Sequence, residues 1–126
     1  SLPRHLWRYH AQRYTLFSRY DRGVRLDEEM WYSVTPEPIA RAQALEIARR
    51  GKSHGGVLVD GFCGAGGNSV QLALHASKPL RCFVLASDLC PTRLRATRHH
   101  AALYGASHRL ELICADFRSV PRLLRR

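Results

Sequence analysis

The sequence has no apolar run close to the roughly 18 residues that a membrane-spanning helix requires, and it shows no secretory leader. We therefore expect neither a membrane span nor export. Internal repeats and low-complexity segments are also missing. The 126 residues, 45% of them apolar, are enough for one globular domain with a real core.

Cysteine pairs close in sequence are absent as well. The four cysteines, Cys63, Cys82, Cys90 and Cys114, are separated by 19, 8 and 24 positions, and no two form a C-x-x-C motif. We interpret them as reduced, mostly buried thiols of an intracellular protein. A metal or disulfide role is the alternative, and no metal is expected.

Lysine is nearly absent, although the net charge is +10: Lys52 and Lys78 are the only lysines. Arginine supplies the charge, with six arginines in residues 1–25 and eight in residues 93–126. Because the planar guanidinium group binds two phosphate oxygens at once, this composition favours a polyanionic partner, with RNA as the first choice. Codon bias combined with solubility is the alternative explanation.

Aromatic residues are interleaved with arginine in residues 1–23, where several recur near helical spacing. We predict a helix over residues 4–19 and a turn at residues 21–23. Such side chains are suited to stacking on bases and holding phosphates. An amphipathic helix that packs its rings on the domain explains them equally well.

The rest of the chain alternates between strand and helix patterns. Thr35-Pro36-Glu37 is typical of a helix start, with Thr35 as the cap, and this helix should end near Arg50 and Gly51. Strands are expected at 57–61, 82–87 and 110–114, with helices at 68–76 and 92–103. This β-α-β-α-β order predicts a parallel sheet with right-handed crossovers.

A glycine-rich turn follows the first strand, because Asp60 precedes Cys63-Gly64-Ala65-Gly66-Gly67-Asn68. Glycine lets the backbone approach a ligand and adopt dihedral angles that a Cβ forbids. The spacing D-x-x-x-G-x-G is typical of S-adenosylmethionine sites, whereas the dinucleotide motif would need glycine in place of Ser69. The residues therefore favour a methyl donor, with a plain tight turn as the alternative.

Three acids, Asp60, Asp88 and Asp116, stand at or just past the carboxyl ends of the predicted strands, the edge where doubly wound sheets bind ligands. Asp88 lies 24 residues beyond Gly64, about the distance at which an acid meets the ribose hydroxyl groups of a ligand on the glycine loop. Asp116 is placed to accept a hydrogen bond from an adenine amine. Turns and helix caps are the alternative roles of such acids.

The whole sequence resembles the trimethylguanosine synthase family of cap-specific guanine-N2 RNA methyltransferases. The ordered blocks that carry the resemblance are Gln12-Arg13-Tyr14-x-Leu16-Phe17-Ser18-Arg19-Tyr20-Asp21, Gly23-x-x-Leu26-Asp27, Trp31-Tyr32-Ser33-Val34-Thr35-Pro36-Glu37, Asp60-x-Phe62-Cys63-Gly64-x-Gly66-Gly67-Asn68 and Cys114-x-Asp116-Phe117. The resemblance implies a class I S-adenosylmethionine-dependent methyltransferase fold, with an incomplete Rossmann-like parallel α/β sheet. We expect a helical N-terminal extension in residues 1–52 and the donor-binding half in residues 53–126.

The resemblance also implies the ligands, namely S-adenosylmethionine as donor and the exocyclic amine of a 7-methylguanosine cap as acceptor, giving 2,2,7-trimethylguanosine. No strong base is needed, because the sulfonium is already activated, and no catalytic residue is assigned. The donor residues would be Thr35, Pro36, Asp60, Cys63, Gly64, Gly66, Gly67, Asn68, Asp88 (ribose), Asp116 and Phe117 (both adenine). The RNA residues would be Arg8, facing the cap phosphates, with Phe17, Ser33 and His100.

The sequence departs from the family pattern in three places. It ends at Arg126, before the fourth strand and the Pro-Pro-Trp segment that supplies the stacking tryptophan in the family. Cys90 replaces a second acid, and His99-His100 replace a pair of asparagines. We therefore expect this chain alone to be inactive. Strand 57–61 should be an exposed apolar edge in a 3-2-1 order, covered in a longer enzyme or by a partner.

The alternative function is a catalytically degenerate subunit of the same fold that binds RNA or scaffolds a ribonucleoprotein. Methylation of ribosomal RNA or of a protein is a third, weaker hypothesis. The expected partners are capped or other structured RNA, together with a protein or ribonucleoprotein at the 57–61 edge, and no membrane. The family suggests a nuclear or cytoplasmic location, and a mitochondrial ribonucleoprotein is the alternative.

Overall fold

A three-stranded parallel sheet lies at the centre of the computed structural model, which describes residues 2–51 and 55–124. Its strands are β1 (Val57–Asp60), β2 (Phe83–Asp88) and β3 (Leu110–Cys114), in the order β1-β2-β3. The register pairs Val57 with Phe83 and Val84 with Leu110. The predicted parallel sheet and its strand order are confirmed, and β1 lies at an edge with its two valines exposed.

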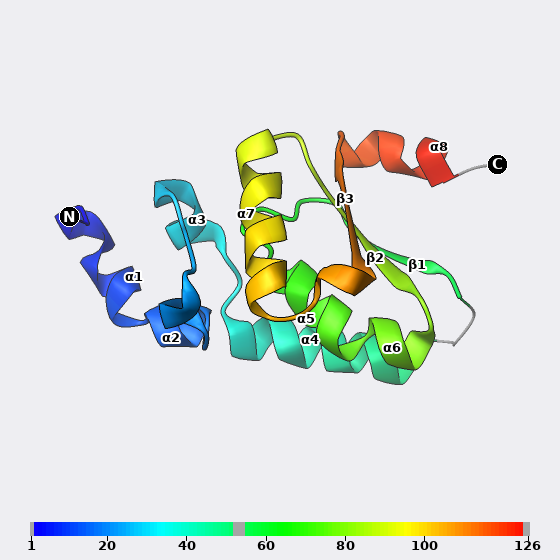
Figure 1. Ribbon diagram of the computed structural model, residues 1–126, viewed down its shortest axis with the longest axis horizontal. Coiled ribbons are helices and arrows are strands. Elements are labelled where there is room, and N and C mark those ends of the chain that lie inside the picture. The colour runs from blue at the N-terminus through cyan, green and yellow to red at the C-terminus, as the bar shows by residue number, and fades with distance from the viewer. Residues whose placement is uncertain (1, 52–54, 125–126) are drawn as a thin grey trace.

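Helices before and between the strands cover the sheet. They are α4 (Glu37–Arg50), α5 (Gly67–His75), α6 (Ser77–Leu80) and α7 (Pro91–Leu103), and η3 (Ser107–Arg109) leads into β3. Helix α4 packs along α5, and Figure 1 shows both running past the sheet with α6. Ala40 and Ala44 are buried on α4, and their small side chains let it come close to its neighbour. After β3 come η4 (Phe117–Ser119) and α8 (Val120–Leu124).

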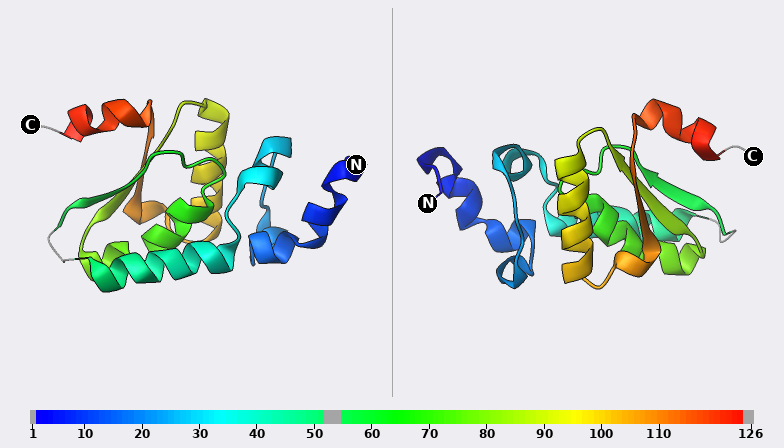
Figure 2. Two further views of the ribbon diagram at one scale, coloured as in Figure 1. Left: turned by 180° about the vertical axis from the view of Figure 1, so that it is seen from behind. Right: turned by 45° about the horizontal axis from the view of Figure 1, so that its top comes forward.

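The N-terminal segment forms short helical pieces rather than the single helix predicted over residues 4–19. These pieces are η1 (Arg4–Leu6), α1 (Trp7–Ala11), α2 (Arg13–Leu16), η2 (Tyr20–Arg22) and α3 (Glu28–Ser33). The break falls at Gln12, whose ψ of 16° lies outside the helical range. Figure 2 shows this segment at one end of the molecule, with α7 between it and the sheet.

One hydrophobic core joins the N-terminal segment to the sheet. Leu6, Phe17 and Trp31 from the segment belong to the same buried cluster as Val84 of β2 and Tyr104 after α7. Burial of this apolar surface holds the segment against α7. All four cysteines carry free thiols, but only Cys63 and Cys82 are buried, so the expectation of mostly buried thiols holds for two of them.

None of the helices within residues 2–51 and 55–124 has both the length and the apolar character needed to cross a membrane.

Candidate functional site

A cavity of about 850 Å³ opens at the carboxyl ends of the three strands. This volume lies within the range of roughly 300–1,000 Å³ that small-molecule sites occupy. Four chain segments line it: residues 33–35 at the end of α3, residues 61–65 and 67–68 after β1, residues 88–90 at the end of β2 and residues 115–118 after β3. Glu29 and Arg93 complete the wall. The cavity therefore collects residues that are distant in the sequence at the ligand-binding edge of a parallel sheet.

The loop after β1 depends on glycine at two positions in different ways. Gly64 and Gly66 both have positive φ, at 52° and 88°. A Cβ on Gly66 would also lie 3.0 Å from the Cα of Thr97 on α7, whereas a Cβ on Gly64 would meet no atom within 4 Å. Gly66 therefore lets the loop approach α7, and Gly64 faces open space at the cavity.

Asp88 connects this loop to the end of β2. One carboxylate oxygen accepts a hydrogen bond from the Gly64 N–H at 3.1 Å, and the other accepts from the Cys90 N–H at 2.9 Å. The side chain is buried and lines the cavity. Because each carboxylate oxygen has more than one lone pair, both keep acceptor capacity for a ligand.

Asp60 supports the loop from outside the cavity. Its carboxylate accepts a hydrogen bond from the Ser69 hydroxyl at 2.6 Å and a longer one, of 3.4 Å, from the Phe62 N–H. Ser69 is fully buried at the start of α5. Asp60 is not among the residues that line the cavity. It therefore holds the beginning of α5 in place.

The Thr35 side chain has a different role from the one predicted for it. Its hydroxyl oxygen accepts a hydrogen bond from the Asn68 side-chain amide at 3.0 Å, which joins the segment after α3 to the loop. The expected role of Thr35 as a helix cap is wrong, because Pro36, with φ −54° and ψ 141°, occupies the N-cap position of α4. Ser33 and Thr35 line the cavity, whereas Pro36 is not among the lining residues.

Asp116 and Phe117 border the cavity after β3. The Arg118 guanidinium group binds the Asp116 carboxylate at 2.6 Å and lowers its pKa to about 2, so this carboxylate stays ionised. The Phe117 ring lies 4.7 Å from the ring of Phe62, and both rings are exposed. A Cβ on Gly61 would come within 2.9 Å of Phe117, so glycine makes room for this pair.

Cys63 belongs to the loop and lines the cavity, although little of its side chain is exposed. The Thr97 hydroxyl lies 2.8 Å from the Gly64 carbonyl oxygen and 3.4 Å from the Cys63 sulfur. Burial raises the pKa of the Cys63 thiol to about 11, which keeps it protonated at neutral pH. The group therefore serves packing and is not a reactive thiolate.

Several lining residues were not predicted from the sequence. Phe62 and Leu89 are large apolar residues within two positions of a strand-end acid, and this placement in the sequence could have identified them; both are exposed at the cavity. Glu29 on α3 and Arg93 on α7 form an ion pair across the rim, which raises the pKa of Arg93. No local sequence pattern links this pair, since it depends on how the two helices pack.

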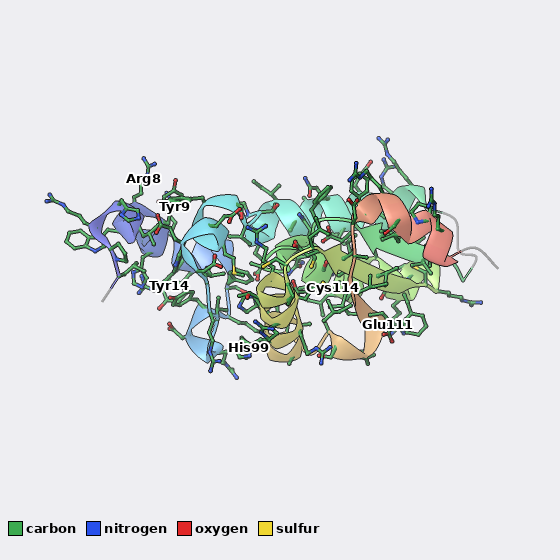
Figure 3. The ribbon with its side chains drawn as sticks, turned by 90° about the horizontal axis from the view of Figure 1, so that it is seen from above. Arg8, Tyr9, Tyr14, His99, Glu111 and Cys114 are labelled. Atoms are coloured by element: carbon green, nitrogen blue, oxygen red, sulfur yellow. The ribbon has the colours of Figure 1, made fainter. Side chains whose placement is uncertain are left out.

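The residues predicted to contact RNA are spread over the molecule. Ser33 is at the cavity. Arg8 is exposed on α1, stacked over Tyr9, and Figure 3 shows both at the N-terminal end. Phe17 is buried against His100, with the two rings 5.0 Å apart. Phe17 and His100 are both in the interior and are not among the cavity residues.

Comparisons with a family model and with individual relatives point to the same family. Residues 55–126 match the family described as RNA cap guanine-N2 methyltransferase. The chain is 35% identical over 116 residues to the trimethylguanosine synthase of Schizosaccharomyces pombe, covering 91% of this chain and 45% of that protein. It is 32% identical over 108 residues to the trimethylguanosine synthase of Saccharomyces cerevisiae, covering 85% of this chain and 32% of that protein. The chain thus spans less than half the length of either relative.

Solved structures agree on the fold. A candidate rRNA-methylase from Clostridium thermocellum superposes with a TM-score of 0.55 at 19% identity, over 67% of this chain and 44% of that one. A candidate transferase from Pyrococcus horikoshii gives 0.53 at 21% identity, over 78% and 34%. The fold is the class I S-adenosylmethionine-dependent methyltransferase fold with an open, incomplete sheet.

Proposed function

Since the chain belongs to the RNA cap guanine-N2 methyltransferase family, we propose that it is the donor-binding part of an enzyme that methylates the guanine N2 of a 7-methylguanosine cap. S-Adenosylmethionine is the proposed donor and 2,2,7-trimethylguanosine the proposed product. The observation that carries the proposal is the cavity at the carboxyl ends of β1, β2 and β3, where the glycine loop, Asp88 and Phe117 meet.

The chemistry of the cavity lining fits S-adenosylmethionine. Asp88 offers acceptor oxygens to ribose hydroxyl groups. The exposed rings of Phe62 and Phe117 offer a flat apolar surface to an adenine ring. The open space beside Gly64 lets a ligand approach the loop backbone. Asp60, Gly66 and Pro36, which do not line the cavity, would act indirectly, by holding the loop and the start of α4.

The bound donor would supply a methyl group on an already activated sulfonium. The residues of the chain then have three tasks, which are to bind, to orient and to keep water out, because positioning and a matched electrostatic environment account for most of the rate in such a site. The Thr35–Asn68 hydrogen bond fixes the wall between the loop and the N-terminal segment. The Glu29–Arg93 ion pair holds α3 beside α7 at the rim, next to the place proposed for the acceptor.

The acceptor side of the proposal rests on Ser33 and on positive charge. Ser33 lines the cavity at the end of α3, and the chain carries a net charge of +10 that suits a phosphate-rich cap. His100 and Phe17 would contribute by supporting the loop and α7 from the interior.

A calorimetric titration with S-adenosylmethionine tests the assignment at the residue level. We expect Phe117→Ala to weaken donor binding about tenfold, because a ring stacked on adenine would be lost. Phe83→Ala is the matched control, since Phe83 is 54% exposed against 44% for Phe117 but lies at the first position of β2, at the opposite edge of the sheet and outside the cavity. Equal affinities for both variants would contradict the adenine site.

The same titration separates the enzyme from the alternative of a degenerate RNA-binding or scaffold subunit. That alternative predicts RNA binding without any affinity for S-adenosylmethionine. Donor binding by the chain, weakened in Phe117→Ala but not in Phe83→Ala, would support the methyltransferase.

A further inference from the structure

A row of cationic and aromatic side chains follows η1, α1 and α2, outside the cavity. Arg4, Trp7, His10 and Arg13 recur at every third position, and Tyr14 adjoins the last of them. Residues three apart on a helix are neighbours. The contacts agree, because the Arg4 guanidinium lies 5.9 Å from the Trp7 ring centre and Arg13 donates to the His10 carbonyl at 2.9 Å. We call these five residues the α1–α2 row.

The two large rings of the α1–α2 row are exposed but held in fixed orientations. Trp7 is 59% exposed and Tyr14 is 47% exposed. The Trp7 indole N–H donates to the Leu2 carbonyl at 3.1 Å, and the Tyr14 hydroxyl donates to Asp21 at 2.8 Å. Their polar atoms are therefore satisfied within the protein, while their apolar ring surfaces remain open to solvent. Ordering the rings in advance lowers the entropic cost of binding a flat partner.

Arg4 is exposed, whereas the half-buried Arg13 already donates hydrogen bonds to the His10 carbonyl and the Tyr14 hydroxyl and would meet an anion with its remaining N–H groups. Arg13 stacks over Tyr14 at 4.5 Å, and its plane extends the aromatic surface. Among the ion pairs formed within residues 2–51 and 55–124, none involves Arg4 or Arg13. Among the neighbouring acids, Glu28 binds His5 and Asp27 caps α3, while Asp21 accepts the Tyr14 hydroxyl at the end of the row. A partner that brings both negative charge and flat rings matches this surface.

We propose that the α1–α2 row binds a single-stranded segment of RNA, with unpaired bases stacked on Trp7 and Tyr14 and phosphates held by Arg4 and Arg13. Single-stranded RNA is the class favoured because its bases are free to stack on aromatic and guanidinium planes, whereas duplex bases are not. Figure 3 shows Tyr14 at the N-terminal end of the molecule, away from Glu111 and Cys114 on β3. The row would therefore hold nucleotides downstream of the cap. This inference rests on the proposed function for the identity of the RNA.

Fluorescence anisotropy with a short, uncapped oligouridylate tests the proposal on this chain. We expect Trp7→Ala and Tyr14→Ala each to weaken binding about fivefold to tenfold, because each removes one stacking surface. Neither variant changes the net charge, so a loss cannot come from weaker general electrostatic attraction. Tyr32→Ala is the matched control, since Tyr32 is also 47% exposed but packs on Tyr9, outside the row. It should bind within twofold of the unmodified chain.

Three results would overturn the proposal: no RNA binding by the chain, unchanged affinity in both row variants, or an equal loss in Tyr32→Ala. Competition by duplex RNA as strong as by single strands would also contradict it. Titration of the same samples with S-adenosylmethionine separates the two hypotheses. Lost RNA affinity in the row variants of a chain that does not bind the donor would leave this inference standing and remove the proposed function. If the chain binds the donor and the row variants retain full RNA affinity, the proposed function stands and this inference is removed.

Discussion

The Nδ1 atom of His100 lies 2.6 Å from the carbonyl oxygen of Ala65, so a histidine on α7 is hydrogen-bonded to the middle of the glycine loop. The other ring nitrogen, Nε2, accepts the Arg25 backbone N–H at 3.0 Å. A carbonyl only accepts and an amide N–H only donates, so the imidazole is neutral with its hydrogen on Nδ1. The residue has 0% exposure, and it joins the N-terminal segment, α7 and the loop.

Removing this side chain should destabilise the fold. We expect His100→Ala to lower the free energy of unfolding by about 2–4 kcal/mol, because it opens a cavity and leaves two buried backbone groups without partners. Urea unfolding measures the change. His108→Ala, at an exposed histidine of η3, should stay within about 0.5 kcal/mol of the unmodified chain. Similar free energies of unfolding for both variants would mean that the two hydrogen bonds of His100 contribute nothing to stability.

The same histidine makes stability depend on pH. Burial is the main cause that lowers the pKa of His100 below its ordinary value of 6.5, and burial lowers the pKa of His75 in the same direction. The unfolded chain therefore takes up protons first as the pH falls through 6.5, and the free energy of unfolding should decrease below that pH. The decrease should not exceed about 1.4 kcal/mol per pH unit for each histidine.

Urea unfolding at pH 7.5 and pH 5.5 measures this dependence within the range where a histidine with an ordinary pKa of about 6.5 changes its charge. His75→Asn should retain the part of the decrease that comes from His100. A stability that stays level or rises on acidification would show that His100 is protonated in the folded protein.

Two glycines of the loop should respond differently to alanine. Gly64→Ala should lower the free energy of unfolding by about 1–2 kcal/mol, since only the positive φ opposes the new side chain. Gly66→Ala should cost more, because its φ of 88° is combined with a Cβ that meets the Thr97 backbone. Urea unfolding of the two variants gives the comparison, and an equal or reversed order would contradict the described packing of the loop on α7.

The ion pair at the end of β3 gives a prediction for one carboxyl group. Arg118→Ala should raise the pKa of Asp116 from about 2 toward its ordinary value of 3.8, because hydrogen bonds from the Arg118 side chain are the largest cause of the shift. NMR titration of the Asp116 carboxyl carbon measures it. Arg122→Ala, at an exposed arginine of α8, should leave Asp116 unchanged. A pKa near 3.8 for Asp116 in the unmodified chain would refute the Asp116–Arg118 ion pair.

Patterns that depend on local spacing predicted the sheet and its helices well. The strands at 57–60 and 110–114, and the helix that ends at Arg50, follow from apolar runs and end signals that the fold does not override. The long helix over residues 4–19 did not form, since the chain breaks at Gln12 and turns extended again at Phe17, which is buried in the core. Thr35 was misread for a related reason, because its hydroxyl has a tertiary partner in Asn68 that no local pattern reveals.

The cavity could be predicted in outline but not in its details. Glycines and strand-end acids place a ligand site at the right edge of a parallel sheet whatever the rest of the chain does. Whether an acid faces the ligand or the protein depends on packing, which separates Asp88, inside the cavity, from Asp60, which binds Ser69. The interior position of His100 is likewise set by the way the N-terminal segment folds over α7.

The most direct test of the account is a calorimetric titration of the chain with S-adenosylmethionine, run beside Asp88→Asn and Glu111→Gln. Both changes remove one negative charge from the sheet, but Asp88 lines the cavity and Glu111 is an exposed residue of β3 outside it. We predict binding at one site, weakened tenfold or more in Asp88→Asn and unchanged in Glu111→Gln. No binding by the unmodified chain, or equal affinity in the two variants, would contradict a donor site at the ends of these strands.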